Sequence, residues 1–373
     1  MTAHRFQSLH DGLQRHIDQG LLPGAVALVH HRGEAVHAEA LGARAPGAEP
    51  MALDTLFRIY SMTKPIVSLA ALMLAEQGRL LLSQPVAHWL PAFADQQVRT
   101  ADGHRVPAVR PATVHDLLRH TAGLSYAWDA GPVQDDYQAA RLGARDLGNA
   151  EQAAALGALP LVHQPGAAWE YSRATDVLGA VLEAVCQEPL GALLQRMVLG
   201  PLGMHDTAFH IAPPQRSRLA EPFAADPQTG APVALLDAAR QPVFESGGGG
   251  LVSTAADYAR FLALLLGQGT LGDVRLAGRK TIAWMTADHL GTTPVAGAIL
   301  PAGYGFGLGV AVRREVGLAA RQGSAGSYGW SGMAGTVFFV DPSEEMFGIL
   351  LTQAPGMLDA LCDLFPNLVY GAL

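Results

Sequence analysis

Apolar residues recur at helical spacing near the start, in the middle and at the end of the chain. In residues 6–19 they return every three or four positions, which predicts an amphipathic helix. Residues 65–77 form a longer apolar run that predicts a buried helix, and Gly78 follows it where a left-handed cap is least costly. The same pattern predicts further helices in residues 255–266 and 357–370.

Strand patterns lie at both ends of the chain. Residues 25–30 and 34–41 flank a His-Arg-Gly turn and predict an antiparallel hairpin. Apolar, partly β-branched runs return near the C-terminus, in residues 307–313, 335–340 and 347–353. Because both ends supply strands, we expect one sheet that the N- and C-terminal segments complete together, in an α/β fold.

The middle of the chain is mostly helical or loop-like, with Ala-rich segments separated by Pro and Gly. A chain of 373 residues also exceeds the usual size of one hydrophobic core. We therefore expect a discontinuous α/β sheet domain, residues 1–84 and 240–373, and a helical domain, residues 85–239. The cleft between two such domains is the expected place for an active site.

Composition narrows the function classes. Hydrophobic residues at 49% and charged residues at 16% exclude a disordered chain, and a net charge of −8 without charged blocks gives no support for nucleic-acid or membrane partners. The two cysteines, Cys186 and Cys362, lack metal-ligand spacing, so we expect neither a disulfide framework nor zinc. The polar start of the chain predicts a cytoplasmic protein, and no apolar segment is long enough to predict a membrane span.

Ser61 and Lys64 stand three residues apart at the start of the apolar helix, where side chains at i and i+3 share one face. Lys64 and Lys280 are the two lysines among 25 cationic residues, so the chain uses arginine almost everywhere else. A buried lysine can give up its proton near neutral pH, whereas an arginine cannot. Lys64 is therefore predicted to help remove the proton of Ser61.

Three motifs follow one another along the chain: Ser-Met-Thr-Lys at 61–64, Pro-Gly-Ala-Ala-Trp-Glu-Tyr-Ser at 165–172, and Gly-Trp-Ser-Gly at 329–332. Supporting motifs lie at residues 117–124, 201–204 and 248–251. Together they resemble the serine β-lactamase and penicillin-binding-protein superfamily, especially the class C-like branch that includes family VIII carboxylesterases. The resemblance covers nearly the whole chain. It implies a β-lactamase-like fold with a central antiparallel sheet flanked by helices and an inserted, mostly helical domain.

The resemblance also implies catalytic roles. Tyr171 would take the Ser61 proton and later activate the water that releases the acyl group. Since a nearby ammonium stabilises a phenolate, Tyr171 and Lys64 are expected to share the role of general base. The oxyanion hole is expected at the backbone N–H groups of Ser61 and Met333, with Met333 on an edge strand just after residues 330–332.

Two departures from the β-lactamase pattern bear on the substrate. Where β-lactamases have Tyr-x-Asn, this chain has Tyr-Ser-Arg at 171–173, and where they have Lys-Thr-Gly it presents Trp-Ser-Gly. An apolar ring replaces a carboxylate-binding cation, which favours neutral, short-chain esters. For Tyr126, a second cleft tyrosine and a plain loop aromatic remain comparable interpretations. Substrate contacts are expected from Tyr126, Arg173, Trp330, Ser331 and Gly332.

Other catalytic classes lack their motifs. No serine stands in a GxSxG elbow, no Walker sequence occurs, and the 14 histidines include no HExxH, so no cofactor or metal is expected. Within the superfamily, the sequence leaves open a carboxylesterase with weak β-lactamase side activity, a β-lactamase or D-amino-acid peptidase, and an acyltransferase. A binding protein without turnover is a further alternative. The expected partner is a small-molecule ester, and the oligomeric state stays open.

Overall fold

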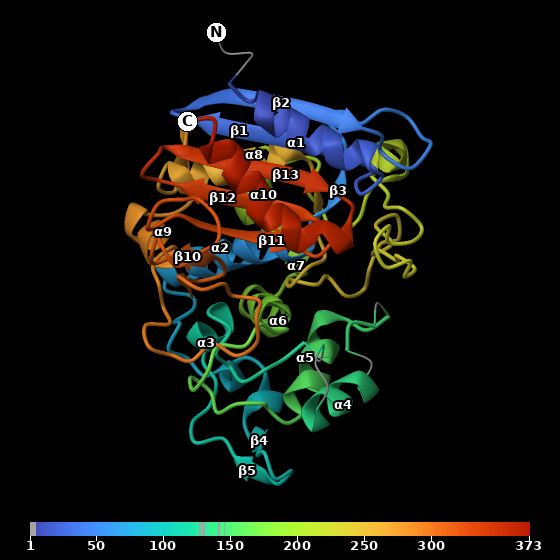
Figure 1. Ribbon diagram of the computed structural model, residues 1–373. Coiled ribbons are helices and arrows are strands. Elements are labelled where there is room, and N and C mark those ends of the chain that lie inside the picture. The colour runs from blue at the N-terminus through green and yellow to red at the C-terminus, as the bar shows by residue number, and fades with distance from the viewer. Residues whose placement is uncertain (1–4, 127, 129–130, 141, 145) are drawn as a thin grey trace.

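A computed structural model describes residues 5–126, 128, 131–140, 142–144 and 146–373. Its centre is a seven-stranded antiparallel sheet in the order β2-β1-β13-β12-β11-β10-β9 (Figure 1). Strand β1 pairs with β13, so the two ends of the chain do complete one sheet, and the predicted fold class is confirmed. The strands are β1 Gly24–His31, β2 Glu34–Gly42, β9 Tyr304–Phe306, β10 Ala311–Arg313, β11 Tyr328–Gly332, β12 Thr336–Asp341 and β13 Met346–Thr352.

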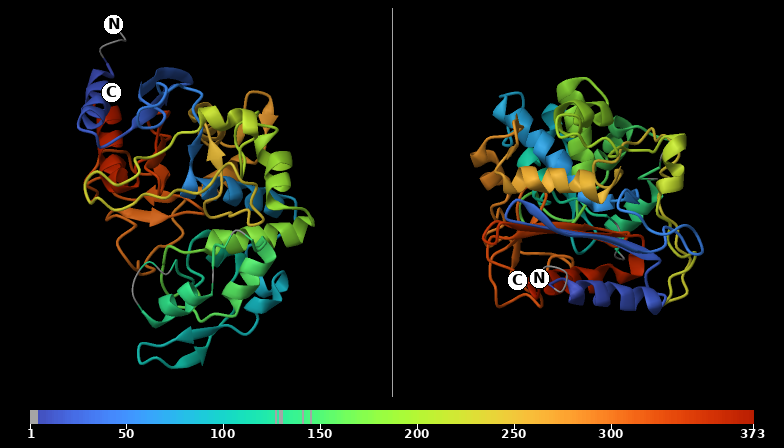
Figure 2. Two further views of the ribbon diagram at one scale, coloured as in Figure 1. Left: turned by 90° about the vertical axis from the view of Figure 1, so that its right-hand side faces the viewer. Right: turned by 90° about the horizontal axis from the view of Figure 1, so that it is seen from above.

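Helices cover both faces of this sheet (Figure 2, right). Helices α1 Gln7–Asp18 and α10 Leu358–Tyr370 pack on one face, over a core that includes Leu13, Phe339 and Phe365. Helices α2 Thr63–Glu76 and α8 Ala255–Leu266 belong to the larger core on the other face. Helix α2 is buried along nearly its whole length, as its apolar sequence predicts, and this burial anchors the residues at its first turn.

A second group of helices and short strands lies beyond α2 (Figure 1). It comprises α3 Val114–Leu118, α4 Pro132–Ala139, α5 Asn149–Gly157, α6 Ala174–Cys186, β4 Gln97–Arg99 and β5 Arg105–Pro107, whereas α7 Leu190–Leu194 lies beside α2. Shorter elements near the sheet are β3 Phe57–Arg58, β6 Val252–Ser253, β7 Thr270–Leu271, β8 Val274–Arg275 and α9 Arg279–Met285. The division into two domains stays a prediction, but Arg58 near the sheet binds Ala220 and Glu221 from the segment assigned to the helical domain.

Two predicted strands differ from the observed ones. Residues 307–313 form no single strand, because Gly307–Val310 turn between β9 and β10. Gly309 makes this turn at φ 97°, and a Cβ there would come within 2.3 Å of the Ser68 hydroxyl on α2, so the close packing requires a glycine. The β9–β10 hairpin then pairs with Tyr328 and Gly329, so β11 is not an edge strand, contrary to the prediction.

Within the described residues, no single helix has the length and apolar character of a membrane span. Helix α6 and the adjoining segment Leu190–Leu199 pass that test only as a pair, bent by 78°. The described residues also contain no group of three or more His, Cys, Asp or Glu side chains arranged to hold a metal ion.

Candidate active site

Ser61 and Lys64 meet at the start of α2, as their spacing predicts. Ser61 lies in a short 3₁₀ turn, Tyr60–Met62, that runs directly into the helix. The Nζ atom of Lys64 is 3.1 Å from the Oγ atom of Ser61. The turn is entered through Tyr60 at φ 42°, a left-handed conformation that is costly for a tyrosine. Strain of this kind persists where the surrounding packing holds it, here at the residue before the hydroxyl.

Lys64 is fully buried and surrounded by polar partners. Besides Ser61, its ammonium donates to the hydroxyl of Tyr126 at 2.8 Å and to the carbonyl of Gly248 at 2.7 Å. Burial lowers the pKa of Lys64 from 10.5 to about 7, against the opposing charge of Asp176 and with a smaller lowering by Arg173. A substantial fraction of Lys64 is therefore neutral amine near pH 7, and can accept a proton.

Asp176 holds the carbonyl that binds Lys64. Its Oδ1 atom accepts hydrogen bonds from the Gly248 N–H at 2.8 Å and from the Ser246 hydroxyl at 2.6 Å. Gly248 thus binds the carboxylate through its N–H and the lysine through its carbonyl. A side chain at Gly248 would meet Asp176 within 3.0 Å, which explains the small residue.

The hydroxyl of Tyr171 contacts Ser61 and not the amine of Lys64. The indole N–H of Trp330 donates to the Tyr171 hydroxyl at 3.1 Å, and Ser61 also hydrogen-bonds with it. Lys64 Nζ instead lies 4.5 Å from the centre of the Tyr171 ring. Burial raises the pKa of Tyr171 above its ordinary value, and these two hydrogen bonds only partly offset the effect. Tyr171 is therefore protonated at neutral pH, which differs from the phenolate expected beside an ammonium.

Tyr126 and Arg173 both lie beside Lys64 and its partners. Besides its bond to Lys64, the Tyr126 ring stacks on Trp128 at 4.4 Å between centroids. The Arg173 guanidinium lies 5.6 Å from the Tyr126 ring and 3.8 Å from Asp176. Of the two interpretations that the sequence left for Tyr126, the structure favours the cleft tyrosine.

The end of β11 forms the other wall of the site. Strand β10 pairs only with Tyr328 and Gly329, which leaves residues 330–332 without a strand partner on that side in the described part of the chain. Met333 lies in the turn after β11 and not on the strand as predicted, and the residue is 47% exposed. A Cβ at Gly332 would come within 2.3 Å of the Ile59 carbonyl, so this strand end approaches the Ser61 turn closely.

Two open spaces meet at Ser61. An outer cleft of about 610 Å³ lies on the Tyr171 side, and its lining includes Trp330, Ser331, Met333 and Cys362. A smaller cavity of about 260 Å³ lies on the other side, and its lining includes Tyr126, Arg173, Gly248 and Met333. Apart from Gly332, every residue predicted for catalysis or substrate binding lines one of these spaces or contacts Ser61 directly. These residues are Ser61, Lys64, Tyr171, Met333, Tyr126, Arg173, Trp330 and Ser331.

Three neighbours of the site were not predicted from the sequence. Trp128 is 60% exposed and lines both spaces, and Asp176 positions Gly248. His120 is buried with its ring 4.9 Å from that of Tyr171; its carbonyl accepts from the Glu170 N–H, and its Nδ1 bonds with Ser172. His120 thereby holds both residues that flank Tyr171. His120 lies inside the motif at 117–124 and Asp176 lies four residues after the motif at 165–172, but a place in or near a motif does not reveal what a side chain contacts.

The sequence and the fold of this chain are similar to those of known proteins. Residues 11–369 match the family model described as Beta-lactamase. Esterase EstB of Burkholderia gladioli is 37% identical over 384 residues, covering 93% of this chain and 91% of EstB. The structure of EstCE1, described as a hydrolase with promiscuous acyltransferase activity, aligns with a TM-score of 0.82 at 30% identity and covers 100% of this chain and 98% of EstCE1. Simvastatin synthase LovD of Aspergillus terreus, at 23% identity and a TM-score of 0.80 over 99% of this chain and 98% of its own, shares the fold.

Proposed function

Because the chain belongs to the β-lactamase family and is a serine hydrolase of that superfamily, we propose that it is a carboxylesterase acting through an acyl-enzyme on Ser61. The observation that carries the proposal is the fully buried Lys64 amine, 3.1 Å from the Ser61 hydroxyl and with a pKa of about 7. This arrangement supplies a base where a nucleophile needs one.

In the acylation step, Ser61 Oγ attacks the ester carbonyl while its proton passes to the neutral Lys64 amine. The negative charge on the carbonyl oxygen is stabilised by the backbone N–H groups of Ser61 and Met333, where β11 ends beside the Ser61 turn. Tyr171 then gives its proton to the alcohol oxygen as the C–O bond breaks. Its raised pKa supports this role, because the hydroxyl is still protonated at neutral pH.

Deacylation runs the same proton transfers in reverse, with water in place of the alcohol. The Tyr171 phenolate left by the first step takes a proton from the water that attacks the acyl carbon. The Lys64 ammonium returns its proton to Ser61 Oγ as the acyl bond breaks. Both groups regain their starting protonation states, so the cycle needs no cofactor.

The position of Tyr171 supports one assignment of the two spaces. The departing alcohol must lie where Tyr171 can protonate it, and Tyr171 lines the larger outer cleft. The smaller cavity beside Tyr126 and Arg173 then holds the acyl group. A short acyl chain fits the smaller space, and the apolar Trp330 wall in place of a cation favours neutral alcohols over carboxylate-bearing β-lactams.

Hydrolysis of p-nitrophenyl acetate beside a chromogenic cephalosporin tests this proposal. We expect rapid ester cleavage that Ser61→Ala abolishes, stoichiometric labelling of Ser61 by a fluorophosphonate, and at most slow cephalosporin hydrolysis. Comparable turnover of both substrates would instead identify a β-lactamase, and an unlabelled Ser61 in folded protein would favour a binding protein.

Acyl transfer to an alcohol is the second candidate. An open cleft beside the acyl carbon admits an alcohol as readily as water, and EstCE1 is described as having promiscuous acyltransferase activity. Adding 1-butanol to the p-nitrophenyl acetate assay distinguishes the two: transfer yields butyl acetate, whereas hydrolysis yields acetate alone.

A further inference from the structure

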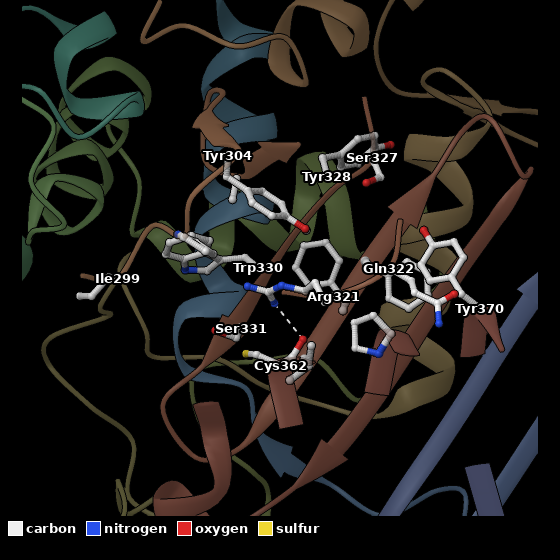
Figure 3. Close-up of a pocket in the computed structure, with 17 residues that line it drawn as sticks. Ile299, Tyr304, Arg321, Gln322, Ser327, Tyr328, Trp330, Ser331, Cys362 and Tyr370 are labelled. Atoms are coloured by element: carbon white, nitrogen blue, oxygen red, sulfur yellow. Dashed lines mark hydrogen bonds between the residues drawn. The ribbon is translucent and has the colours of Figure 1, made fainter. Parts of the chain in front are cut away.

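A small, partly open pocket of about 110 Å³ lies behind the outer cleft, between β11, β12 and helix α10 (Figure 3). Six residues line both this inner pocket and the outer cleft, so the two share a wall: Ile299, Pro301, Arg321, Trp330, Ser331 and Cys362. The inner pocket therefore directly adjoins the outer cleft, whose lining includes Ser61 and Tyr171.

Small residues on one face of β11 create this pocket. Side chains alternate along a strand, so Gly329 and Ser331 point to the same face. Ser331 hydrogen-bonds with Cys362 on α10, which identifies that face as the one toward the helix. A glycine and a serine leave space there, which Val337 and Phe339 of β12 close from the side.

Several polar groups of the wall already have hydrogen-bond partners. Arg321 donates to the Cys362 carbonyl at 2.8 Å, as the dashed line in Figure 3 marks, and lies 3.4 Å from Asp363. The Tyr370 hydroxyl donates to Asp341 at 2.6 Å, and Ser327 donates to the Ser324 carbonyl at 2.8 Å. With these groups satisfied and rings and aliphatic side chains around them, the pocket suits an apolar occupant.

We infer that the inner pocket is a distal subsite for the alcohol part of the ester, and that it takes an apolar chain or branched group of about four carbons. An apolar cavity of roughly 150 Å³ accepts a benzene ring, so one of about 110 Å³ holds a somewhat smaller group. The inference rests on the proposed function, because it is Tyr171 that places the alcohol in the outer cleft.

Two substitutions of Val337 change the pocket in opposite directions. Val337→Phe fills it and Val337→Ala enlarges it, while Val109→Phe adds the same ring at a position 80% exposed and outside every cavity described here. The measurement is kcat/KM for ethyl, butyl, hexyl and octyl acetate, followed by acid release. A second series, ethyl butanoate, hexanoate and octanoate, lengthens the acyl group instead.

We expect the wild-type protein to prefer hexyl over ethyl acetate. Val337→Phe should lower that ratio at least tenfold, Val337→Ala should move the optimum toward octyl acetate, and Val109→Phe should keep the wild-type ratio. Unchanged alcohol profiles in both Val337 variants would overturn the inference, and so would a shift confined to the acyl series. If Ser61→Ala cleaves ethyl acetate as fast as the wild type, the proposed function itself fails, which is a separate result.

Discussion

On the Lys64 side of Ser61, polar groups hold one another in place; on the Trp330 side, largely apolar walls enclose open space. Lys64 has three hydrogen-bond partners and Asp176 fixes the Gly248 peptide beside it. Across the serine, the outer cleft of about 610 Å³ adjoins the inner pocket of about 110 Å³. The first side sets the protonation state of Lys64, and the second sets which alcohol group of the ester fits. Substitutions on the two sides should therefore change different kinetic quantities.

Replacing the lysine should have the largest effect. Lys64→Arg keeps the charge but removes the ability to accept a proton, so we expect kcat/KM on p-nitrophenyl acetate to fall roughly 10³-fold or more. Lys280→Arg is the matched control, since Lys280 is the other lysine and lies exposed on α9, and should match the wild type. Circular dichroism checks the fold. A Lys64→Arg protein with wild-type rates would rule out the proposed base.

Removing the hydroxyl groups of Tyr171 and Tyr126 one at a time should distinguish the roles of the two tyrosines. A poor leaving group needs a proton and a good one does not, so Tyr171→Phe should slow ethyl acetate cleavage roughly 10²-fold or more and p-nitrophenyl acetate cleavage much less. Tyr126→Phe removes only a partner of Lys64 and should slow both esters equally, by about tenfold. The same leaving-group dependence in both variants would mean that the two tyrosines have no distinct roles.

The dependence of kcat/KM on pH should report the protonation state of Lys64. Lys64 with a pKa of about 7 accepts a proton only when neutral, so kcat/KM should rise with pH, about tenfold per unit below the midpoint, and level off above it. Asp176 raises the pKa of Lys64, so Asp176→Asn should move the midpoint to lower pH while its amide oxygen can still hold Gly248. A profile flat from pH 5.5 to 8.5, or a midpoint moved upward by Asp176→Asn, would contradict this assignment.

The smallest effect should come from the contact that joins the two sides. Trp330→Phe keeps an apolar ring but removes the N–H that donates to Tyr171 at 3.1 Å, so we expect a roughly threefold to tenfold fall in kcat. Trp284→Phe, at a 43% exposed position on α9, serves as the control. A change in alcohol preference without a change in kcat would show that Trp330 acts only as part of the wall.

Local patterns predicted much of the fold. The first helix, the N-terminal hairpin, α8 and the two C-terminal strands appear within a residue or two of their predicted positions. These elements have a clear period and clear end signals, such as Gly78 after α2. The β9–β10 hairpin was not predicted: the strand expected at residues 307–313 covers its turn and β10, and that turn depends on Gly309 packing against Ser68 of α2.

From the sequence by itself, the ordered motifs predicted the β-lactamase-like fold through their resemblance to that superfamily, and the i, i+3 spacing at a helix start predicted that Ser61 and Lys64 meet. Only the tertiary structure decided that Lys64 bonds with Tyr126, that Tyr171 stays protonated beside Ser61, and that an inner pocket lies behind Trp330. The physical reason is that hydrogen-bond partners, burial and empty volume belong to segments far apart in the chain. A pKa or a cavity exists only once those segments have packed.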